Sequence, residues 1–580
     1  MVNWIKPILN FITFNEPTKM DEAFILKEYD KESDKESFDM SSPGAKDKKK
    51  SELKKPTPIE DFNKETSNDS ADLEKVSKSL DQNLAFLKEK YSIGINTDIK
   101  IRNFDITLQE KVYKAFIIFI DGITDKTLIN NSILQPLMIF TSFEKSPNNL
   151  DIIEYIERSL CTQNQLAKSD NYQEILMNIN IGACVLFVEG ANQALLFDVK
   201  TWEHRAVSRP NTEITLRGPQ ESFSETLRVN TALVRKILRN ENLIVESTTI
   251  GQRSRTPCSV IYLKDLANPN LVNEVKRRLD SLKIDYAGDS GIIEQLIEDR
   301  NFLPSPQIIS TERPDRVASM LSEGRVAIIV DGNPFALVVP ITFFNLFHSA
   351  EDIYIRFPYV NFIRFIRAIA IIASLLLPGL YLAITNFHQE MIPTDLLLAI
   401  SGARERVPFP SVVEIIIMEI SFELIREAGI RMPGTIGPTL GIIGALILGQ
   451  AAVAANIVSP ILIIIVAVTG IGSLAIPSYS ESLAFRINRF VYILLGAIAG
   501  LLGITLALFL HGLLLASTKS FGVPFLAPFA PRTSNVLDDT ITKAPIWMEE
   551  NRPDYINPLD ITRQPKISKG WISRKNKGDK

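Results

Sequence analysis

Cysteine and histidine are scarce in this chain of 580 residues, which has three cysteines and four histidines. Cys161, Cys184 and Cys258 show no C-x-x-C spacing, so neither a disulfide framework nor a zinc site is predicted. The sequence also lacks a P-loop, a Ser-His-Asp order and a metal signature, which argues against an enzyme and a bound cofactor. A net charge of −4 implies no general attraction to nucleic acid.

A secretory signal is also missing. The first 14 residues include apolar side chains, but Lys6, Pro7 and Asn10 interrupt them and no small-residue cleavage site follows. Two interpretations of this start stay open: a short amphipathic helix that touches a membrane, or a poorly ordered end. Without an export signal, the charged first half is expected to lie in the cytoplasm.

What the chain does have is a sharp division near Pro358. A long charged half precedes it, and long apolar stretches follow. A membrane-spanning helix needs roughly 20 apolar residues, and only the third stretch falls slightly short of that. The stretches are Ile363–Phe387, Thr435–Ala455, Ile461–Ile476 and Phe490–Ala516. We therefore expect a polytopic α-helical membrane domain with a soluble domain on one face, which limits the function to transport, conduction, sensing or assembly.

Composition divides the chain into five segments. Residues 15–70 interleave both charge signs and hold few large apolar residues, so they cannot bury enough surface to offset the entropy of ordering. The tail is polar, contains prolines and is expected to be poorly ordered. The segments are a disordered start at 1–70, a first soluble subdomain with a linking helix at 71–240, a second subdomain at 241–357, a transmembrane helical domain at 358–517 and a polar tail at 518–580.

Two parts of the soluble half look alike. Each has an apolar strand, a helix, and a closing hairpin in which an acidic residue and a glycine separate two apolar runs. The strands are Val112–Ile120 and Cys258–Leu263, and the hairpins are Gly182–Val199 and Gly324–Ile341. An acid followed by glycine between apolar runs is a strong hairpin signal. The soluble half is therefore predicted to be α/β, built from a duplicated βαββ module.

The acids of these turns have two interpretations. Asp121, Glu189 and Asp331 could be ligand carboxylates, but turn chemistry explains them more simply. Between the two units, Gly218–Asn240 is predicted to be a helix with a basic C-terminal part, where cations suit the macrodipole. That helix is either solvated or faces lipid headgroups.

One helix-like segment of the membrane half, Ser411–Gly429, is unusually charged. Its charged residues are Glu414, Glu419, Glu423, Arg426 and Glu427. The last four share one face and Glu414 lies nearly opposite. Charges at membrane depth cost roughly 3 kcal/mol each near the centre. Either such acids from several subunits form a ring that attracts cations, or the segment is a surface helix with a solvated charged face.

Small residues recur in the apolar stretches. Gly437, Gly441, Ala445 and Gly449 follow every four residues and predict a helix-packing face, as do Gly496 and Gly500 later in the chain. Gln450 and Asn456 are amides that either line a path or bond to a neighbouring helix.

The number of spans stays open. Four spans return the tail to the cytoplasm, but they place several arginines outside, against the positive-inside rule. A fifth span over Ser411–Gly429 places Arg426, Arg431, Arg486 and Arg489 inside, but it moves the basic tail outside. A re-entrant segment or a sixth crossing would repair this.

Several long motifs, in order, resemble one family closely. They are RGPQESFSETLRVNTALVR (Arg217–Arg235), TPCSVIYLKDLANP (Thr256–Pro269), GRVAIIVDGNPFALVVP (Gly324–Pro340), FELIREAGIRMP (Phe422–Pro433) and GPTLGIIGALILGQAAVAANIVSP (Gly437–Pro460). Over about residues 95–535 the chain is similar to the A subunit of the GerA family of spore germination proteins.

The resemblance implies a subunit of a nutrient germinant receptor in the inner membrane of a bacterial endospore. It implies a permease-like B subunit, a lipoprotein C subunit and a scaffold lipoprotein as partners. It further implies two thioredoxin-like subdomains in the soluble half, and a membrane half that oligomerises into an ion-conducting channel. No cofactor is expected.

Three functions are weighed on this basis. The first is a receptor and channel subunit that couples germinant sensing to ion release. The second is a secondary transporter or permease with a cytoplasmic regulatory domain, which usually shows paired interrupted helices in two halves. Here one Gly-rich segment stands out without a partner repeat, which favours the channel. The third is a membrane enzyme, which is the least supported of the three functions.

Overall fold

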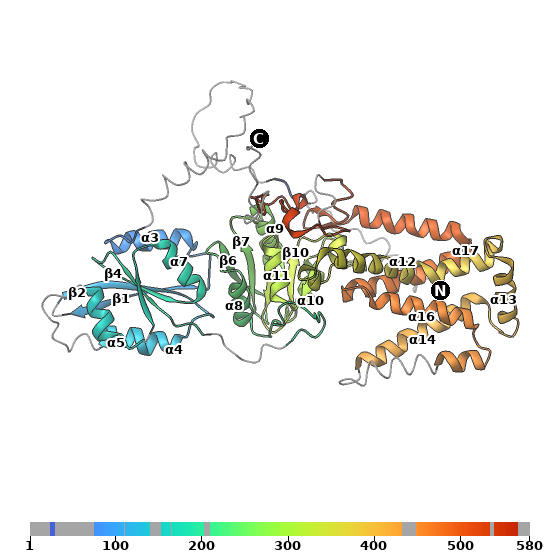
Figure 1. Cartoon of the computed structure of the whole chain (residues 1–580), viewed down its shortest axis with the longest axis horizontal. Coiled ribbons are helices and arrows are strands. Elements are labelled where there is room, and N and C mark those ends of the chain that lie inside the picture. Colours follow the sequence, from blue (N-terminus) through green and yellow to red (C-terminus); the bar gives the residue numbers. More distant parts are fainter. Residues whose placement is uncertain are drawn as a thin grey trace, which may run out of the picture.

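The structure, a computed structural model, describes residues 24–28, 75–108, 111–139, 152–163, 165–201, 209–431, 448–533 and 539–565. Its sheets and helices lie in three consecutive regions, two with a sheet each and one of helices (Figure 1). The predicted start helix, most of the charged N-terminal segment, and Gly437, Gly441 and Ala445 lie outside the described residues.

The first region holds a five-stranded antiparallel sheet. In space the strands follow the order β1-β2-β4-β5-β3. Their bounds are β1 Ile99–Leu108, β2 Lys111–Ile120, β3 Leu166–Ser169, β4 Cys184–Val188 and β5 Ala194–Phe197. The helices are α3 Leu80–Lys90, α4 Lys126–Leu128 with a π-turn at Ile129–Leu134, α5 Gln135–Ile139, α6 Ile152–Tyr155 with a π-turn at Ile156–Leu160, and α7 Tyr172–Ile181.

Helices cover both faces of this sheet. Along β2, Ile117 packs with the helices that follow that strand, whereas Phe116 and Ile118 pack with α3 and α7 on the other side. Alternate residues of a strand point to opposite faces, so an unbroken apolar run marks a strand that is buried on both sides. Figure 1 shows α3 and α7 on one face and α4 and α5 on the other.

The second region repeats this plan. Its antiparallel sheet has the order β6-β7-β9-β10-β8, which is the same pattern as in the first. Its strands are β6 Leu243–Ile250, β7 Thr256–Leu263, β8 Ile309–Thr311, β9 Val326–Val330 and β10 Ala336–Val339. Its helices are α9 Pro269–Ser281, α10 Ser290–Ile297 and α11 Pro314–Leu321. In each sheet, the first and the third strand along the chain were not predicted from the sequence.

The linking helix is shorter than expected. α8 spans Leu227–Ile237 rather than the whole of Gly218–Asn240. The preceding turn is held by Asn230, whose amide bonds both backbone atoms of Ser224. Asp331, from the hairpin of the second unit, accepts a hydrogen bond from Leu227 N at 2.9 Å. That carboxylate therefore caps a helix, where an anion suits the macrodipole.

Arg235 of α8 is buried rather than solvated. Its guanidinium pairs with Asp98 of the first region and also donates to Leu243 O of the second, at 3.0 Å. The side chain is 3% exposed. The basic end of α8 therefore ties the two sheets together instead of facing lipid.

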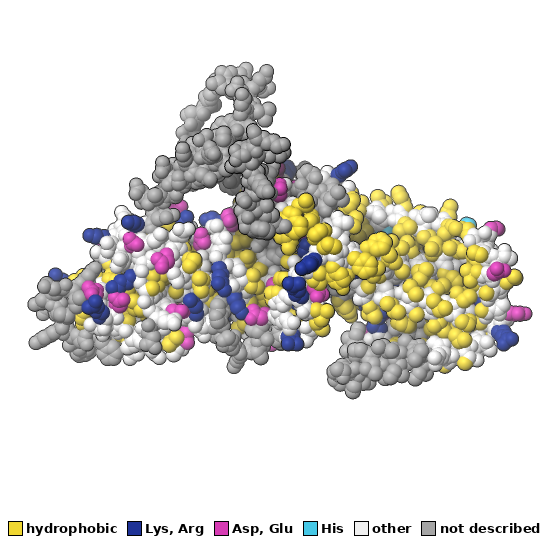
Figure 2. Space-filling view, in the orientation of Figure 1, with side chains coloured by type: hydrophobic (Ala, Val, Ile, Leu, Met, Phe, Trp, Pro, Cys, Tyr) yellow, Lys and Arg dark blue, Asp and Glu magenta, His cyan; other side chains and the backbone are white. Residues whose placement is uncertain are grey.

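From Phe357 the chain is helical. Its helices are α12 Phe357–Phe387, α13 Thr394–Arg404, α14 Ser411–Arg431, α16 Pro460–Leu474 and α17 Tyr479–Ser517, with a further helical segment at 448–454. Among the described residues, α12 and α17 are long and apolar enough to span a membrane, and α16 is a shorter apolar helix. Figure 2 shows hydrophobic side chains over this region and charged ones over the sheets.

α17 is not the single span expected over Phe490–Ala516, because it reverses at Gly500. That residue has φ 59° and ψ −138°, a conformation that favours glycine. Tyr492 Oη lies 3.1 Å from His511 Nδ1, although 19 residues of straight helix would separate them by about 28 Å. Gly500 is therefore a turn between two antiparallel helices, and a Cβ on it would lie 3.0 Å from Phe387 at the end of α12.

Both ends of the α17 hairpin contact the second sheet region. Glu481 Oε1 accepts from Ser305 Oγ at 3.1 Å, and Ser517 Oγ accepts from Arg300 Nη1 at 2.9 Å. The reversal at Gly500 lies against Phe387, at the opposite end of α12. The chain therefore runs away from the sheets along the first half of α17 and returns along the second.

The described parts of the tail, residues 518–533 and 539–565, pack against the rest of the protein, contrary to the expected poor order. Phe521 and Phe525 are buried in the two cores of the second region. Asn557 Nδ2 donates to Leu26 O at 3.0 Å, so the tail also holds a piece of the N-terminal segment that was expected to be disordered. Leu26 is 6% exposed and lies in the same core as α9.

Candidate functional site: charges among the helices

α14 runs back toward the sheet regions. Its first residue, Ser411, donates to Asn386 Oδ1 at 3.0 Å, near the end of α12 that lies far from the sheets. Near its other end, Arg426 donates to Ser473 Oγ at 2.9 Å, close to the end of α16. α16 begins beside Glu414 and runs the same way.

Glu419 is buried against an arginine of α17. Its side chain is 1% exposed and that of Arg489 is 2% exposed, with 2.5 Å between Oε2 and Nη1. Arg489 also reaches Ser374 Oγ of α12 at 3.4 Å. Removing charges from water is costly unless they are paired. The pair therefore joins α12, α14 and α17 through one electrostatic contact.

Glu423 makes a second link of the same kind. Its Oε2 accepts from Arg486 Nη1 at 2.8 Å, and its side chain is 30% exposed. We call the residues Glu419, Glu423, Arg426, Arg486 and Arg489 the buried charge cluster. The surface-helix reading of α14 does not fit this arrangement, because its acids face arginines inside the helical region.

Glu427 differs from the rest of its predicted face. It is 59% exposed and pairs with Arg431, one turn further along α14, at 2.6 Å. Glu414 is likewise separate: it is fully buried and accepts from Ser459 N at 3.0 Å, at the N-terminus of α16. A carboxylate there is favoured by the positive end of the helix.

The remaining predicted residues lie elsewhere. Gln450 and Asn456 are exposed, and neither belongs to the buried charge cluster. Gly449 is buried, and a Cβ on it would lie 3.6 Å from Ile463 of α16. A Cβ on Gly496 would lie 2.7 Å from Gly379 O, so α12 and the first half of α17 approach closely there.

Sequence reasoning missed Arg486 and Arg489 as partners. From the sequence, both arginines are expected only among the charges that fall on the cytoplasmic side of the membrane. The available signal was spacing: two arginines three apart on one helix can face two glutamates four apart on another.

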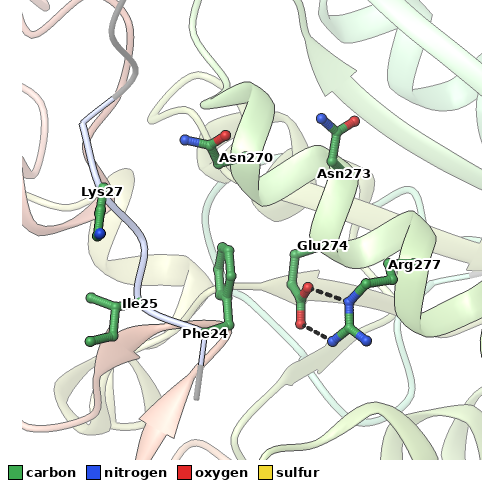
Figure 3. A pocket seen from close by; sticks show the side chains of 7 residues that line it. All are labelled: Phe24, Ile25, Lys27, Asn270, Asn273, Glu274 and Arg277. Carbon is green, nitrogen blue, oxygen red and sulfur yellow. Dashed lines mark hydrogen bonds and ion pairs between the residues drawn. The ribbon is translucent and has the colours of Figure 1, made fainter. Parts of the chain in front are cut away.

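A shallow pocket in the soluble half offers no comparable chemistry. It lies between residues 24–27 and α9 (Figure 3), and Glu274 in its wall is bonded by Arg277. Burial favours a raised pKa for Glu274, but hydrogen bonds from Arg277 and Arg278 outweigh it and hold the pKa below its usual value. The charge of the Glu274 carboxylate is therefore already offset by two arginines.

Comparison with known proteins assigns the chain to a family. Residues 85–555 match the family described as Bacillus/Clostridium GerA spore germination protein. The chain is 38% identical over 506 residues to spore germination protein KA of Bacillus subtilis, covering 86% of this chain and 92% of that protein. It is 36% identical over 477 residues to spore germination protein GerLA of Bacillus cereus, covering 82% and 96%.

A third relative and one solved structure are also similar in sequence. The uncharacterized membrane protein YfkQ of Bacillus subtilis is 38% identical over 472 residues, covering 81% of this chain and 90% of that protein. The N-terminal domain of the A subunit of the Bacillus megaterium germinant receptor GerK3 is 32% identical, covering 46% of this chain and 97% of that one, with a TM-score of 0.37.

These matches define a class of membrane proteins, the A subunits of spore germinant receptors, which are not enzymes. The chain belongs to the GerA family of spore germination proteins.

Proposed function

We propose that this receptor subunit assembles with copies of itself into a membrane channel that opens when the receptor senses a germinant and then releases ions. In this proposal it acts with a permease-like B subunit, a lipoprotein C subunit and a scaffold lipoprotein, in the inner membrane of the endospore. The two sheet regions are thioredoxin-like and face the cytoplasm.

The observation that carries the proposal is the buried charge cluster. Ionisable residues within membrane helices are costly and mark ion paths or their gates. Arg489 and Glu419 lie where α12, α14 and α17 meet, so a change in their pairing would shift α14 against both neighbours. The cluster therefore fits a contact that holds α14 in its resting position, which we call the latch of α14, better than it fits a ring of unpaired acids.

The outer face of α14 supports assembly with other copies. Ile417, Ile420 and Leu424 are 37%, 48% and 66% exposed, and Glu427 continues this stripe toward the sheet side. If copies bury the apolar part against one another, their Glu427 side chains gather around one mouth. A ring of acids there would attract cations.

The test is ion flux through the reconstituted receptor, with and without nutrient. A channel gives passive cation flux that starts on nutrient addition, and Glu427→Gln lowers its rate at unchanged subunit abundance. Glu405→Gln is the matched control, because Glu405 is an exposed acid beyond α13, at the far side. Saturable exchange that requires substrate on the opposite side would instead establish the secondary transporter.

The predicted path residues enter the same assay. Glu419→Gln with Glu423→Gln keeps the shape of both side chains and removes their charge. Because this change leaves Arg486 and Arg489 without their acids, cation release is compared per amount of subunit in the membrane, and lower release by that measure supports their part in the path or its gate. Unchanged release in that double variant excludes it.

A further inference from the structure

A polar cavity lies where three parts of the chain meet. The tail segment from Asp539 covers the second sheet region and the first turns of α12, and the space enclosed is about 180 Å³. Six arginine or lysine side chains and four carboxylates line it. The cavity therefore carries more cationic than anionic groups.

Arg364 is the cationic residue that α12 contributes to this cavity. It is 8% exposed and donates to Asp352 at 3.3 Å and to Asp539 at 2.8 Å. Its buried Nη1 makes no hydrogen bond to any residue that the structure describes. Burying a donor without a partner is costly, so an acceptor supplied from outside the chain would be favoured here.

Glu549 lies in the same wall and pairs with Arg563 at 2.9 Å. Burial raises the pKa of Glu549 above its usual value despite the nearby arginine. A raised pKa makes the ionised form of Glu549 less favourable, and that is the form that repels an anion. The cavity thus becomes more favourable for an anion than a count of its acids suggests.

Beside the cavity, a short helix of the tail exposes large apolar side chains. Ile546, Trp547 and Met548 are 57%, 41% and 61% exposed. The Trp547 ring stands edge-on to Phe357, the first residue of α12, with 6.0 Å between ring centroids. Ile546 also lines the cavity, so the apolar patch and the polar space are continuous.

The patch also continues onto the outer surface of α12. Tyr359 and Phe362 are 56% and 62% exposed, on the helix that is apolar enough to span a membrane. Tryptophan and tyrosine concentrate at the headgroup level of membranes. This continuity selects a lipid surface as the occupant.

We propose that Ile546–Met548 of the tail sits in the headgroup layer of the membrane and that the adjoining cavity binds the phosphate of an anionic lipid through Arg364. The tail would then anchor the second sheet region to the bilayer at the start of α12. Nε and Nη2 of Arg364 are bonded to Asp352 and Asp539, so the phosphate would accept from the N–H groups of the unpartnered Nη1.

The first experiment measures where Trp547 lies. The full chain carries Phe in place of Trp4, Trp202 and Trp571 and is reconstituted in vesicles whose acyl chains are brominated near the headgroup. Strong quenching of Trp547 fluorescence is expected. Weak quenching is expected in a matched chain that carries Phe at position 547 as well and has Val112→Trp, at an exposed position of β2, as its one tryptophan. Equal quenching in both chains contradicts the anchor.

The second experiment measures lipid retained by the purified full chain. We expect phosphatidylglycerol to be retained at least tenfold better than phosphatidylcholine, and Arg364→Gln to remove that preference. Because Arg364→Gln also loses two ion pairs, Arg563→Gln, at a 40% exposed side chain, is measured beside it and should lower retention several-fold. Arg431→Gln, exposed and outside the cavity, serves as the control.

Two outcomes overturn the lipid site. One is equal retention of both lipids in the parent chain. The other is displacement of phosphatidylglycerol by millimolar inorganic phosphate, because that would show a site for a free small anion.

Discussion

Both halves of the molecule bury arginine–acid pairs, but they complete them differently. In the soluble half, Arg313 is fully buried and donates to Asp315, Thr215 and two backbone carbonyls. In the helical half, Arg489 is almost as buried, yet its Nε has no partner among the described residues, and neither has Glu419 Oε1.

The difference separates structure from function. A buried charge whose hydrogen bonds are complete holds a fold together, and replacing the whole network can be neutral. A buried pair that is left incomplete costs free energy in the resting state, and we propose that the protein keeps it for a second state in which the pairing changes. The comparison therefore singles out Glu419 and Arg489 rather than the better-bonded Arg313.

The largest expected effect is in the soluble half. Arg313→Met leaves the carboxylate of Asp315 buried without its ion partner. Breaking one side of a buried pair costs about 3–5 kcal/mol, so thermal unfolding of the soluble half in the purified full chain should occur at a much lower temperature. Arg253→Met, at an 84% exposed side chain, is the control and should change little. Equal stability of the two variants contradicts a structural role for Arg313.

In the helical half, each charge of the pair of Glu419 and Arg489 is expected to contribute to stability as long as the other charge is present. Glu419→Gln alone leaves Arg489 as an unpaired buried charge. Breaking one side of a buried pair costs about 3–5 kcal/mol of stability, so subunit abundance should fall. Glu419→Gln with Arg489→Gln removes both charges and should restore abundance. Quantitative immunoblotting of the membrane fraction measures both.

Ion release then separates two roles for the pair. If the pair only holds helices together, the double variant should release ions like the parent. If it is the latch of α14, release should stay altered at normal abundance. Parent-like germination of the double variant would remove the pair from the mechanism.

The third prediction concerns packing. Gly496→Leu places a side chain against Gly379 O, which is backbone and cannot rotate away. Overpacking typically costs about 1–3 kcal/mol, so recovery of the assembled complex should decrease. Gly512→Leu is the control, because a Cβ there meets nothing within 4 Å. The corresponding Gly441→Leu prediction lies outside the described residues.

Sequence patterns predicted the parts of the fold that depend on local chemistry. The hairpins β4–β5 and β9–β10 follow from acid-Gly turns between apolar runs, and the duplication follows from their repetition. The short strands β3 and β8 were missed because four and three residues give too little periodicity to recognise. Their place in the sheet depends on pairing with distant strands.

The candidate site was predictable only in part. The cost of charge in lipid marked Glu419 and Glu423, but their partners lie 63 to 70 residues away, and spacing within one helix cannot show that. The reversal at Gly500 was missed for a related reason. A single glycine in an apolar run suits both a packing face and a turn. Only the backbone angles of Gly500 in the folded chain identify the turn.

The smallest expected effect concerns pH and the soluble half. Burial, with Glu298 and Asp289 nearby, raises the pKa of Glu294 to about 8. Burial likewise raises the pKa of Glu298 to about 7. Both pKa values exceed those of the unfolded chain, so the folded state holds these protons more tightly. Stability should therefore decrease as pH rises from about 4.5 toward 8.

Glu294→Gln keeps the shape of the side chain and cannot ionise, so it should flatten this dependence. Thermal unfolding of the purified full chain at several pH values measures it, with Glu89→Gln, at an exposed glutamate of α3, as the control. Unlike the pair in the helical half, Glu294 can avoid its burial cost by keeping its proton. A pH profile that is the same for Glu294→Gln and the parent chain would mean that Glu294 reaches solvent and that the contrast between the two halves is smaller than the structure indicates.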